Sequence, residues 1–499
     1  MRSTLSSAPS KSAFGEQIGV IMTPQFQYCS QYGKLNNEII TSYNSNGTNT
    51  SSGGLVSVGI NTTNGAYSIM QSKRLITYNP GQGGCARFTC SFNAGVASST
   101  QLAGVGNSFN GFFFGYNGTQ FGILRRYGGR PEIRKLTISS AFASTTTITI
   151  TLNSVAITAT NVISAGGSFQ FSAFQIVQNS RTNFLNAGWL VENIGADVIF
   201  TNIFDGAKSG TYSVNWGSSS GNGSFTQPAA GVSATNSWIS QTSWKYDTMN
   251  GLGYSKMTID PTKINVYEIK WQYLGAGKIF FSIEDNDASY SGFQLVHAIE
   301  YPNTYNIPSL ENANLKMHYS IISSGSTTAM TLNMVSFAGF TEGIIRRFEP
   351  RYSITSAKTG ITTEKALFIL RNGNTYNNIF NCGEILLTSL TISTDGTKNA
   401  TIKIYLSNSG TTTYGTSTSD FVTFSNVDSN NSIALYDTTD STITNGINIY
   451  TFTLAKVDKL ILDLTPLNIY LAPNDEITIT GASSLSVDIN TSISWVEIQ

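Results

Sequence analysis

The sequence predicts a mainly β protein, with an antiparallel β-sandwich that contains a small inserted α+β module and a second β-sandwich after it. Three observations favour this fold class. Apolar and polar residues alternate over short segments, turns rich in Gly and Asn separate these segments, and one segment has helical periodicity. The chain has 499 residues, more than one ordinary core holds, so we expect two or three domains.

The first sandwich is predicted over residues 66–136 and 227–342. Residues 112–116 and 121–124 are apolar and flank Asn117-Gly118, a dipeptide that tolerates the positive φ of a tight hairpin turn. This pattern is typical of two antiparallel strands.

The clearest strand covers residues 267–273, where Tyr267, Ile269 and Trp271 alternate with polar residues. Residues 279–283 alternate in the same way after a Gly-rich turn. Because successive side chains of a strand point to opposite faces, we expect the aromatic face to be core rather than a ligand platform.

Residues 137–226 are predicted to form the inserted α+β module. Its expected elements are a hairpin at 146–160, a helix at 168–180 with Phe169, Ala173, Ile176 and Val177 on one face, and strands at 189–192, 198–203 and 212–216.

Three further segments complete the predicted organisation. Residues 1–65 are expected to be an arm or irregular lead-in, because residues 44–54 are a long polar run that cannot bury enough surface to fold alone. Residues 343–362 are interpreted as a short basic linker. Residues 363–499 are predicted to form a jelly-roll-like β domain, because it contains about ten short apolar segments separated by turns.

The composition restricts the class of partner. Charged residues make up 12% of the chain, and Lys+Arg and Asp+Glu balance at 29 each. The densest basic stretch, residues 125–135, is interpreted as the solvated flanks of a hairpin. This balance argues against nucleic acid as a partner. The chain shows neither a signal peptide nor a membrane-spanning run, so we expect no membrane insertion. Four irregularly spaced cysteines suit reduced thiols.

Chemical motifs are weak. Residues 217–221 match a nucleophile-elbow pattern by composition but lack the helix that such an elbow needs. The two histidines, His297 and His318, are expected to be sheet residues. The acidic residues at 284–287, and Asp437 with Asp440, lack EF-hand spacing. The sequence therefore assigns no catalytic residue, no cofactor and no metal.

Four aromatic residues in predicted loops are candidates for stacking on sugars: Tyr127, Trp216, Trp244 and Tyr254. Burial in a core or an interface is the alternative for each of them.

Several segments resemble the lectin-like modules found in virion proteins of large double-stranded DNA viruses and tailed phages. They are residues 79–89, 111–118 and 257–269. The insert around 148–216 resembles a small module seen inside such proteins, and the C-terminal unit, with residues 467–475, resembles their terminal β-domains. These are structural rather than catalytic motifs, so the resemblance implies no site residues.

The resemblance and the low charge together predict a non-enzymatic virion structural protein on the capsid or tail surface. Such a protein is expected to assemble in the host cytoplasm as a homo-oligomer, a trimer or pentamer, beside other virion proteins, with host-surface glycan as a further partner. A carbohydrate-binding module is one alternative. A polysaccharide depolymerase, which would need two carboxylates in a cleft, is another.

Overall fold

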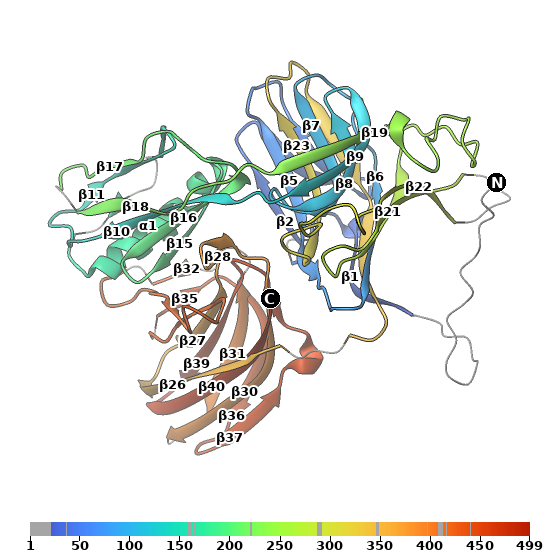
Figure 1. Ribbon diagram of the computed structural model, residues 1–499. Helices are drawn as coiled ribbons and strands as arrows, with labels where there is room; N and C mark the ends of the chain where they lie inside the picture. The colour runs from blue at the N-terminus through green and yellow to red at the C-terminus, as the bar shows by residue number, and fades with distance from the viewer. Residues whose placement is uncertain are drawn as a thin grey trace, which may run out of the picture.

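The computed structural model describes residues 21–499 apart from residues 36, 158–161, 164, 220–221, 287–291, 346–348, 397, 408–412, 416 and 440. Figure 1 shows a large β-sandwich, a smaller module reached from it by two neighbouring strands, and a C-terminal β-sandwich that lies beneath both. The fold class predicted from the sequence is confirmed.

The first sandwich packs two large antiparallel sheets face to face. One sheet has the order β1 (Met22–Cys29), β25 (Ser336–Glu342), β6 (Gly83–Cys90), β20 (Asn265–Gln272), β21 (Ile279–Glu284) and β22 (Phe293–Ile299). The other has the order β19 (Thr235–Ser240), β9 (Gln120–Tyr127), β8 (Gly111–Asn117), β7 (Ser99–Gly106), β23 (Leu315–Ser323), β5 (Tyr67–Ile76) and β2 (Ile39–Tyr43). A three-stranded sheet joins β24 (Met330–Met334), β4 (Leu55–Ile60) and β3 (Gly47–Ser52).

The predicted hairpin and the predicted aromatic strand both lie in this sandwich. Strands β8 and β9 pair from Asn117 opposite Gln120, and Gly118 in the turn between them has φ +60°. On β20 the side chain of Tyr267 is buried, with its ring 4.8 Å from that of Phe114 on the facing sheet. The aromatic face is therefore core, as predicted.

The expected N-terminal arm is wrong from Met22 onward. Phe26 and Tyr28 on β1 are buried in the main core, and β4 also contributes to it. The polar segment that suggested a loop becomes β3, because it pairs along its whole length with the apolar β4 and so satisfies its backbone hydrogen bonds. Residues 1–20 lie outside the described residues.

The inserted module combines a four-stranded sheet with one helix and small pairs of strands. The sheet has the order β15 (Trp189–Ile194), β16 (Asp197–Asp205), β10 (Pro131–Ile138) and β18 (Gly223–Ala229). The smaller pairings use β11 (Thr146–Thr147) with β14 (Val162–Ile163), and β12 (Thr149–Leu152) with β13 (Val155–Ile157) and β17 (Ser213–Asn215).

The helix α1 (Phe169–Asn186) confirms the predicted helix and extends beyond it. The hydroxyl of Ser168 caps it by accepting a hydrogen bond from the N–H of Phe171 at 3.2 Å. Ala173, Ile176 and Val177 are buried, but Phe169, expected on the same face, is 42% exposed because it lies in the first turn, at the end of the packed surface.

The C-terminal domain is a second sandwich of two antiparallel sheets. One contains β26 (Arg351–Ile361), β40 (Val487–Ile498), β30 (Glu384–Gly396) and β37 (Lys459–Asp463), with β38 (Tyr470–Leu471) also on β30. The other contains β33 (Ser425–Asn426), β34 (Ala434–Asp437), β27 (Lys365–Asn372), β39 (Glu476–Ser483), β31 (Ala400–Ser407) and β36 (Ile447–Leu454). Two short hairpin-like pairs add β28 (Thr375–Tyr376) with β29 (Ile379–Phe380), and β32 (Thr413–Tyr414) with β35 (Ile443–Thr444).

Two predictions in this region need correction. The expected linker at 343–362 is mostly strand, because Arg351–Ile361 pairs with β40 and the side chains of Tyr352 and Ile354 pack on the core. The segment 421–424, one of the short apolar segments predicted to be strands of this domain, is not a strand, although Val422 and Phe424 are buried. Both side chains pack on helix α1 and its neighbours rather than inside the sandwich.

Candidate functional site

The four aromatic residues predicted to stack on sugars fall in four different environments. Tyr254 is 88% exposed in the loop before β20, and Tyr127 is half-buried at the end of β9. Trp216 packs partly on the core of the inserted module, 6.0 Å from the ring of Phe142. The structure therefore does not bring these residues together into one platform.

The interpretation of Trp244 as an exposed stacking residue is wrong. Its side chain is 5% exposed and packs at right angles to the rings of Phe114 and Phe121 in the main core. The sequence around Trp244 has the composition of a polar loop, but in the structure this loop packs on the first sandwich. A large apolar side chain in such a covering loop is buried by the hydrophobic effect.

Tyr127 lines a cavity of about 440 Å³ where the first sandwich meets the β28–β29 hairpin. The cavity combines aromatic, amide and charged groups, and Arg130 reaches Glu311 at 3.4 Å on its rim. We call this the Tyr127 cavity. Its lining consists of Asn107, Phe109, Asn110, Tyr127, Gly129, Arg130, Pro131, Pro308, Glu311, Asn312, Ile379, Phe380 and Cys382.

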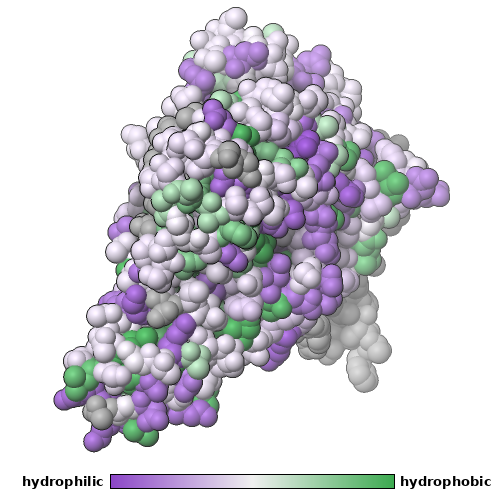
Figure 2. All heavy atoms as spheres, turned by 90° about the vertical axis from the view of Figure 1, so that its left-hand side faces the viewer, coloured by the Kyte–Doolittle hydropathy of each residue, from purple (hydrophilic) through white to green (hydrophobic). Residues whose placement is uncertain are grey.

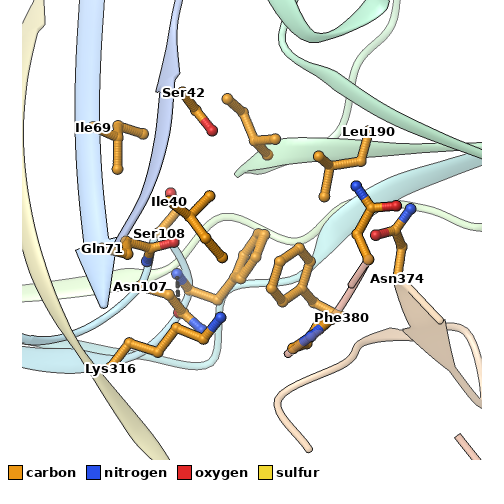
Figure 3. Close-up of a pocket in the computed structure, with 14 residues that line it drawn as sticks. Ile40, Ser42, Ile69, Gln71, Asn107, Ser108, Leu190, Lys316, Asn374 and Phe380 are labelled. Atoms are coloured by element: carbon orange, nitrogen blue, oxygen red, sulfur yellow. Dashed lines mark hydrogen bonds between the residues drawn. The ribbon is translucent and has the colours of Figure 1, made fainter. Parts of the chain in front are cut away.

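A smaller cavity, of about 70 Å³, lies where the first sandwich, the inserted module and the C-terminal domain meet. Figure 3 shows Gln71, Asn107 and Lys316 of the first sandwich turned toward it from one side and Asn374 from the other. We call this the Asn374 cavity. It is next to the Tyr127 cavity, because both are lined by Phe109 and Phe380, whose rings are 5.0 Å apart.

The amide of Asn374 is the most notable group in the smaller cavity. It is 1% exposed, and neither its oxygen nor its nitrogen has a hydrogen-bond partner among the described residues. Its backbone N–H, by contrast, donates to the carboxylate of Glu192 at 3.0 Å. A polar cavity of this size has room for ordered water, which is the usual partner of such buried groups.

Buried ion pairs surround these cavities. Lys73 on β5 contacts Asp475 at 2.9 Å, and both side chains are almost fully buried. Near them, Glu384 on β30 accepts a hydrogen bond from the N–H of Leu75 at 2.6 Å. Burial raises the pKa of Asp475 against the opposing effect of Lys73, and it lowers the pKa of the neighbouring Lys316. These charges join the first sandwich to the C-terminal domain.

A second buried network lies where the inserted module meets the C-terminal domain, and its ion pair is formed within the C-terminal domain. Arg371 on β27 contacts Glu476 on β39 at 2.6 Å, and the hydroxyl of Tyr414 donates to the same carboxylate at 3.0 Å. Although burial opposes it, Arg371 and Arg181 lower the pKa of Glu476. On α1, burial and the neighbouring Arg371 lower the pKa of Arg181 to about 10, while Glu192 acts in the other direction.

The weak chemical motifs do not develop into reactive sites in the described part of the chain. Residues 217–219 follow β17 and lead into strand β18 rather than a helix, and the rest of the elbow pattern lies outside the described residues. Both histidines are strand residues, as expected. Asp437 is buried and accepts from two backbone N–H groups, those of Thr423 and Thr439.

Of the other acidic residues considered for Ca²⁺, Glu284 is the last residue of β21 and Asp285 follows it, whereas Asp287 and Asp440 lie outside the described residues. Within the ranges that the structure describes, His, Cys, Asp and Glu side chains nowhere gather in a group of three that could hold a metal ion. Nor does any helix in those ranges have the length and apolar character needed to cross a membrane.

Sequence reasoning did not find the charged residues at the junctions. A signal was present, since Lys73, Arg371 and Glu476 interrupt strongly apolar strands, and a charged residue in such a strand is usually paired. Which charges pair could not be inferred, because Lys73 and Asp475 are separated by 402 positions.

Comparison with known proteins gives weak likenesses only. No family model matches, and no curated protein matches. Among solved structures, peanut lectin with a 9mer peptide is 10% identical with a TM-score of 0.26, covering 66% of this chain and 100% of the lectin. Arcelin-5, a lectin-like defense protein from Phaseolus vulgaris, is 8% identical with a TM-score of 0.22, covering 65% and 99%.

A viral capsid protein is also among the matches. The STIV MCP is 8% identical with a TM-score of 0.17, covering 92% of this chain and 97% of that protein. At scores this far below 0.5, no conclusion about this chain is drawn from these likenesses.

Proposed function

We propose that this chain is a non-enzymatic structural protein of a virion, located on the capsid or tail surface. It would self-assemble as a trimer or pentamer, contact other virion proteins and present loops for host attachment. The observation that carries the proposal is that the first sandwich and the inserted module are both joined to the C-terminal domain, the first by the buried Lys73–Asp475 ion pair and the second by an apolar cluster, in a chain whose charge is otherwise low.

Rigid fixation is unusual for neighbouring domains, which by default move relative to each other. Here the buried pair Lys73–Asp475 connects the first sandwich to the C-terminal domain, and breaking such a pair leaves an uncompensated charge. An apolar cluster connects the inserted module to the C-terminal domain, with Phe171 and Phe174 of α1 packed among residues of that domain. A building block that must hold its shape in an assembly benefits from this arrangement.

The surface supports the same proposal. The face in Figure 2 is mostly pale, the colour of residues of intermediate hydropathy, with purple and green residues interspersed. Charged side chains are expensive to desolvate when two proteins pack, and they are depleted at the centres of interfaces. A surface rich in hydroxyls and amides lowers this cost for contacts with other copies.

Light scattering on the purified chain, coupled to size exclusion, tests the proposal. We expect a mass of three or five copies at micromolar concentration. A mass of one copy across the accessible concentration range would contradict it. Electron microscopy of particles labelled with an antibody against the chain would then test its location.

Carbohydrate binding is a second candidate, favoured by the Tyr127 cavity. The half-buried ring of Tyr127 lines the same cavity as the Arg130–Glu311 pair, an arrangement suited to stacking on a sugar ring while the charged pair hydrogen bonds its hydroxyls. On a glycan array we expect Tyr127→Ala to lose any binding that the unmodified chain shows, and Tyr254→Ala to retain it. A depolymerase has less support there, because Glu311 is the one carboxylate among the described lining residues and glycosidases use a pair.

A further inference from the structure

Strand β37 is an edge strand with an unusually symmetric sequence. It reads Lys459-Leu460-Ile461-Leu462-Asp463 and pairs with β30 along one side. No strand in the described part of the chain pairs with its other side. In Figure 1 it lies at the lower end of the C-terminal domain; the edge strand of the facing sheet is β36.

The hydrogen bonds to β30 show which backbone groups are left at the outer side. The carbonyl of Asp458 accepts from the N–H of Thr394, and the N–H of Leu464 donates to the carbonyl of Thr388, both at 2.9 Å. Because hydrogen-bonded positions alternate along an antiparallel strand, the even-numbered residues of β37 face β30. Lys459, Ile461 and Asp463 therefore direct their N–H and C=O groups outward. The N–H of Lys459 donates to the carboxylate of Asp458 at 2.7 Å, a bond that a pairing strand would replace.

We propose that the outer side of β37 pairs with β37 of a second copy of this chain, antiparallel, about a two-fold axis at Ile461. In this register Ile461 lies opposite Ile461 of the second copy, and Lys459 lies opposite Asp463 on both sides of the axis. Each of the three outward-facing residues then lies opposite an outward-facing residue of the second copy, in a hydrogen-bonded position. The register therefore allows the backbone hydrogen bonds to form together with the charge pairs.

Charge complementarity selects this occupant and this register. A parallel pairing in register would place Lys459 beside Lys459 and Asp463 beside Asp463, and like charges directly opposite are destabilising. Shifting the antiparallel register by two residues moves each charge away from its opposite. The antiparallel register centred on Ile461 brings both charge pairs together.

The exposed apolar side chains at this edge give the pairing a driving force. Ile461 is 67% exposed, whereas Leu460 and Leu462 pack against the core. On β36, the edge strand of the facing sheet, Ile447 and Ile449 are also exposed. Protected edge strands usually carry proline, a bulge or several charges. Strand β36 has neither proline nor charge, although its register with β31 shifts between Ile404 and Tyr405. Apolar edges of this kind favour association.

This inference rests on the proposed self-assembly and names one contact in it. A two-fold contact between like surfaces closes on itself, so alone it gives a dimer. Between trimers or pentamers it would link neighbouring oligomers through a sheet that continues from one copy into the next.

Charge reversal tests the register. Lys459→Asp places carboxylates opposite each other at both pairs, and Asp463→Lys places ammonium groups there. We expect each variant to weaken self-association about tenfold or more, because two attractive pairs become two repulsive ones. The double variant restores opposite charges and should associate like the unmodified chain. An equimolar mixture of the two single variants should also associate, as a mixed pair.

Lys456→Asp is the matched control, because it makes the same charge change at an exposed residue in the turn before β37. Self-association is measured by sedimentation velocity over a range of concentrations. Thermal unfolding of each variant is measured as well, because the carboxylate of Asp463 also accepts a hydrogen bond from the N–H of Thr465 at 2.9 Å. If Asp463→Lys does not fold, Ile461→Asp places two carboxylates across the axis and should weaken association in the same way.

Two results would overturn the inference and are distinguishable. If the unmodified chain self-associates and the variants leave the association constant unchanged, β37 is not the contact, while the proposed assembly stands. If the unmodified chain is monomeric at every concentration, both the contact and the proposed assembly are contradicted.

Discussion

His318 is a buried histidine on β23, in the interior of the seven-stranded sheet. Its Nδ1 lies 3.0 Å from the amide nitrogen of Gln71, and its Nε2 lies 2.9 Å from the hydroxyl of Ser320. The Gln71 nitrogen is a donor, so Nδ1 must accept and the ring must be neutral with its proton on Nε2. Protonating Nδ1 would set two donors against each other in a site that is 1% exposed.

This arrangement makes the first sandwich sensitive to acid. Burial, with Arg126 nearby, lowers the pKa of His318 from 6.5 to about 3. The unfolded chain therefore takes up a proton at this residue below about pH 6.5, while the folded chain does not until about pH 3. The stability contributed by the neutral ring is complete above pH 6.5 and is lost as the pH falls. At pH 5 the loss is about 2 kcal/mol.

The variant His318→Gln isolates this effect, because glutamine does not titrate. We expect its free energy of unfolding to change by about 2 kcal/mol less between pH 7 and pH 5 than that of the unmodified chain. Urea unfolding at both pH values gives the comparison. His297, whose pKa burial lowers to about 4, is present in both proteins and cancels.

A direct measurement can refute the reasoning. The chain has two histidines, so ¹⁵N-labelled histidine gives a simple NMR spectrum in which each ring titrates separately. A pKa near 6.5 for His318, or an equal pH dependence of unfolding in the two proteins, would show that the ring is not held neutral.

Three further outcomes are expected. Arg371→Met should destabilise the C-terminal domain by about 3–5 kcal/mol, because it leaves the carboxylate of Glu476 buried without its guanidinium; a urea midpoint equal to that of the unmodified chain would contradict this. Trp244→Ala should lower the free energy of unfolding by about 3–5 kcal/mol, because it opens a cavity in the core. Tyr254→Ala should leave the melting temperature unchanged, because that side chain is exposed. Equal effects of the two substitutions on the melting temperature would contradict the burial of Trp244. Of the four thiols, exposed Cys29 should react first with a thiol reagent, because burial raises the pKa of the other three, and rapid modification of a second thiol would be inconsistent with the structure.

The sequence allowed most of the strands to be predicted where alternation is strong. The aromatic strand β20 and the long strands β30 and β40 were found because their apolar side chains face one core. Strand β26 was taken for a linker because most of its residues are polar or charged, and it is the outermost strand of its sheet. Its pairing comes from β40, which lies more than 100 residues later and leaves no trace in the local pattern.

Site prediction was less successful for the same reason. The exposure of an aromatic residue depends on what folds over it, so Trp244 and Tyr254 look alike in sequence but have opposite environments. The two cavities lie between bodies, with lining residues from distant parts of the chain such as Gln71 and Asn374. Composition, by contrast, is a property of the whole chain, and it remains the sequence observation on which the proposed function depends.

The pairing of β1 with β25 has a consequence for synthesis of the protein. It joins Met22 to Glu342, so the first sandwich cannot close until residue 342 has left the ribosome. The inserted module is complete in sequence by Ala229 and can fold earlier. During translation the N-terminal strands therefore have unpaired edges while the inserted module, which comes later in the chain, folds. Closing a loop between strands as far apart in sequence as β1 and β25 is also slow. The nascent chain should accordingly depend on chaperones until the last strand of the first sandwich has been made.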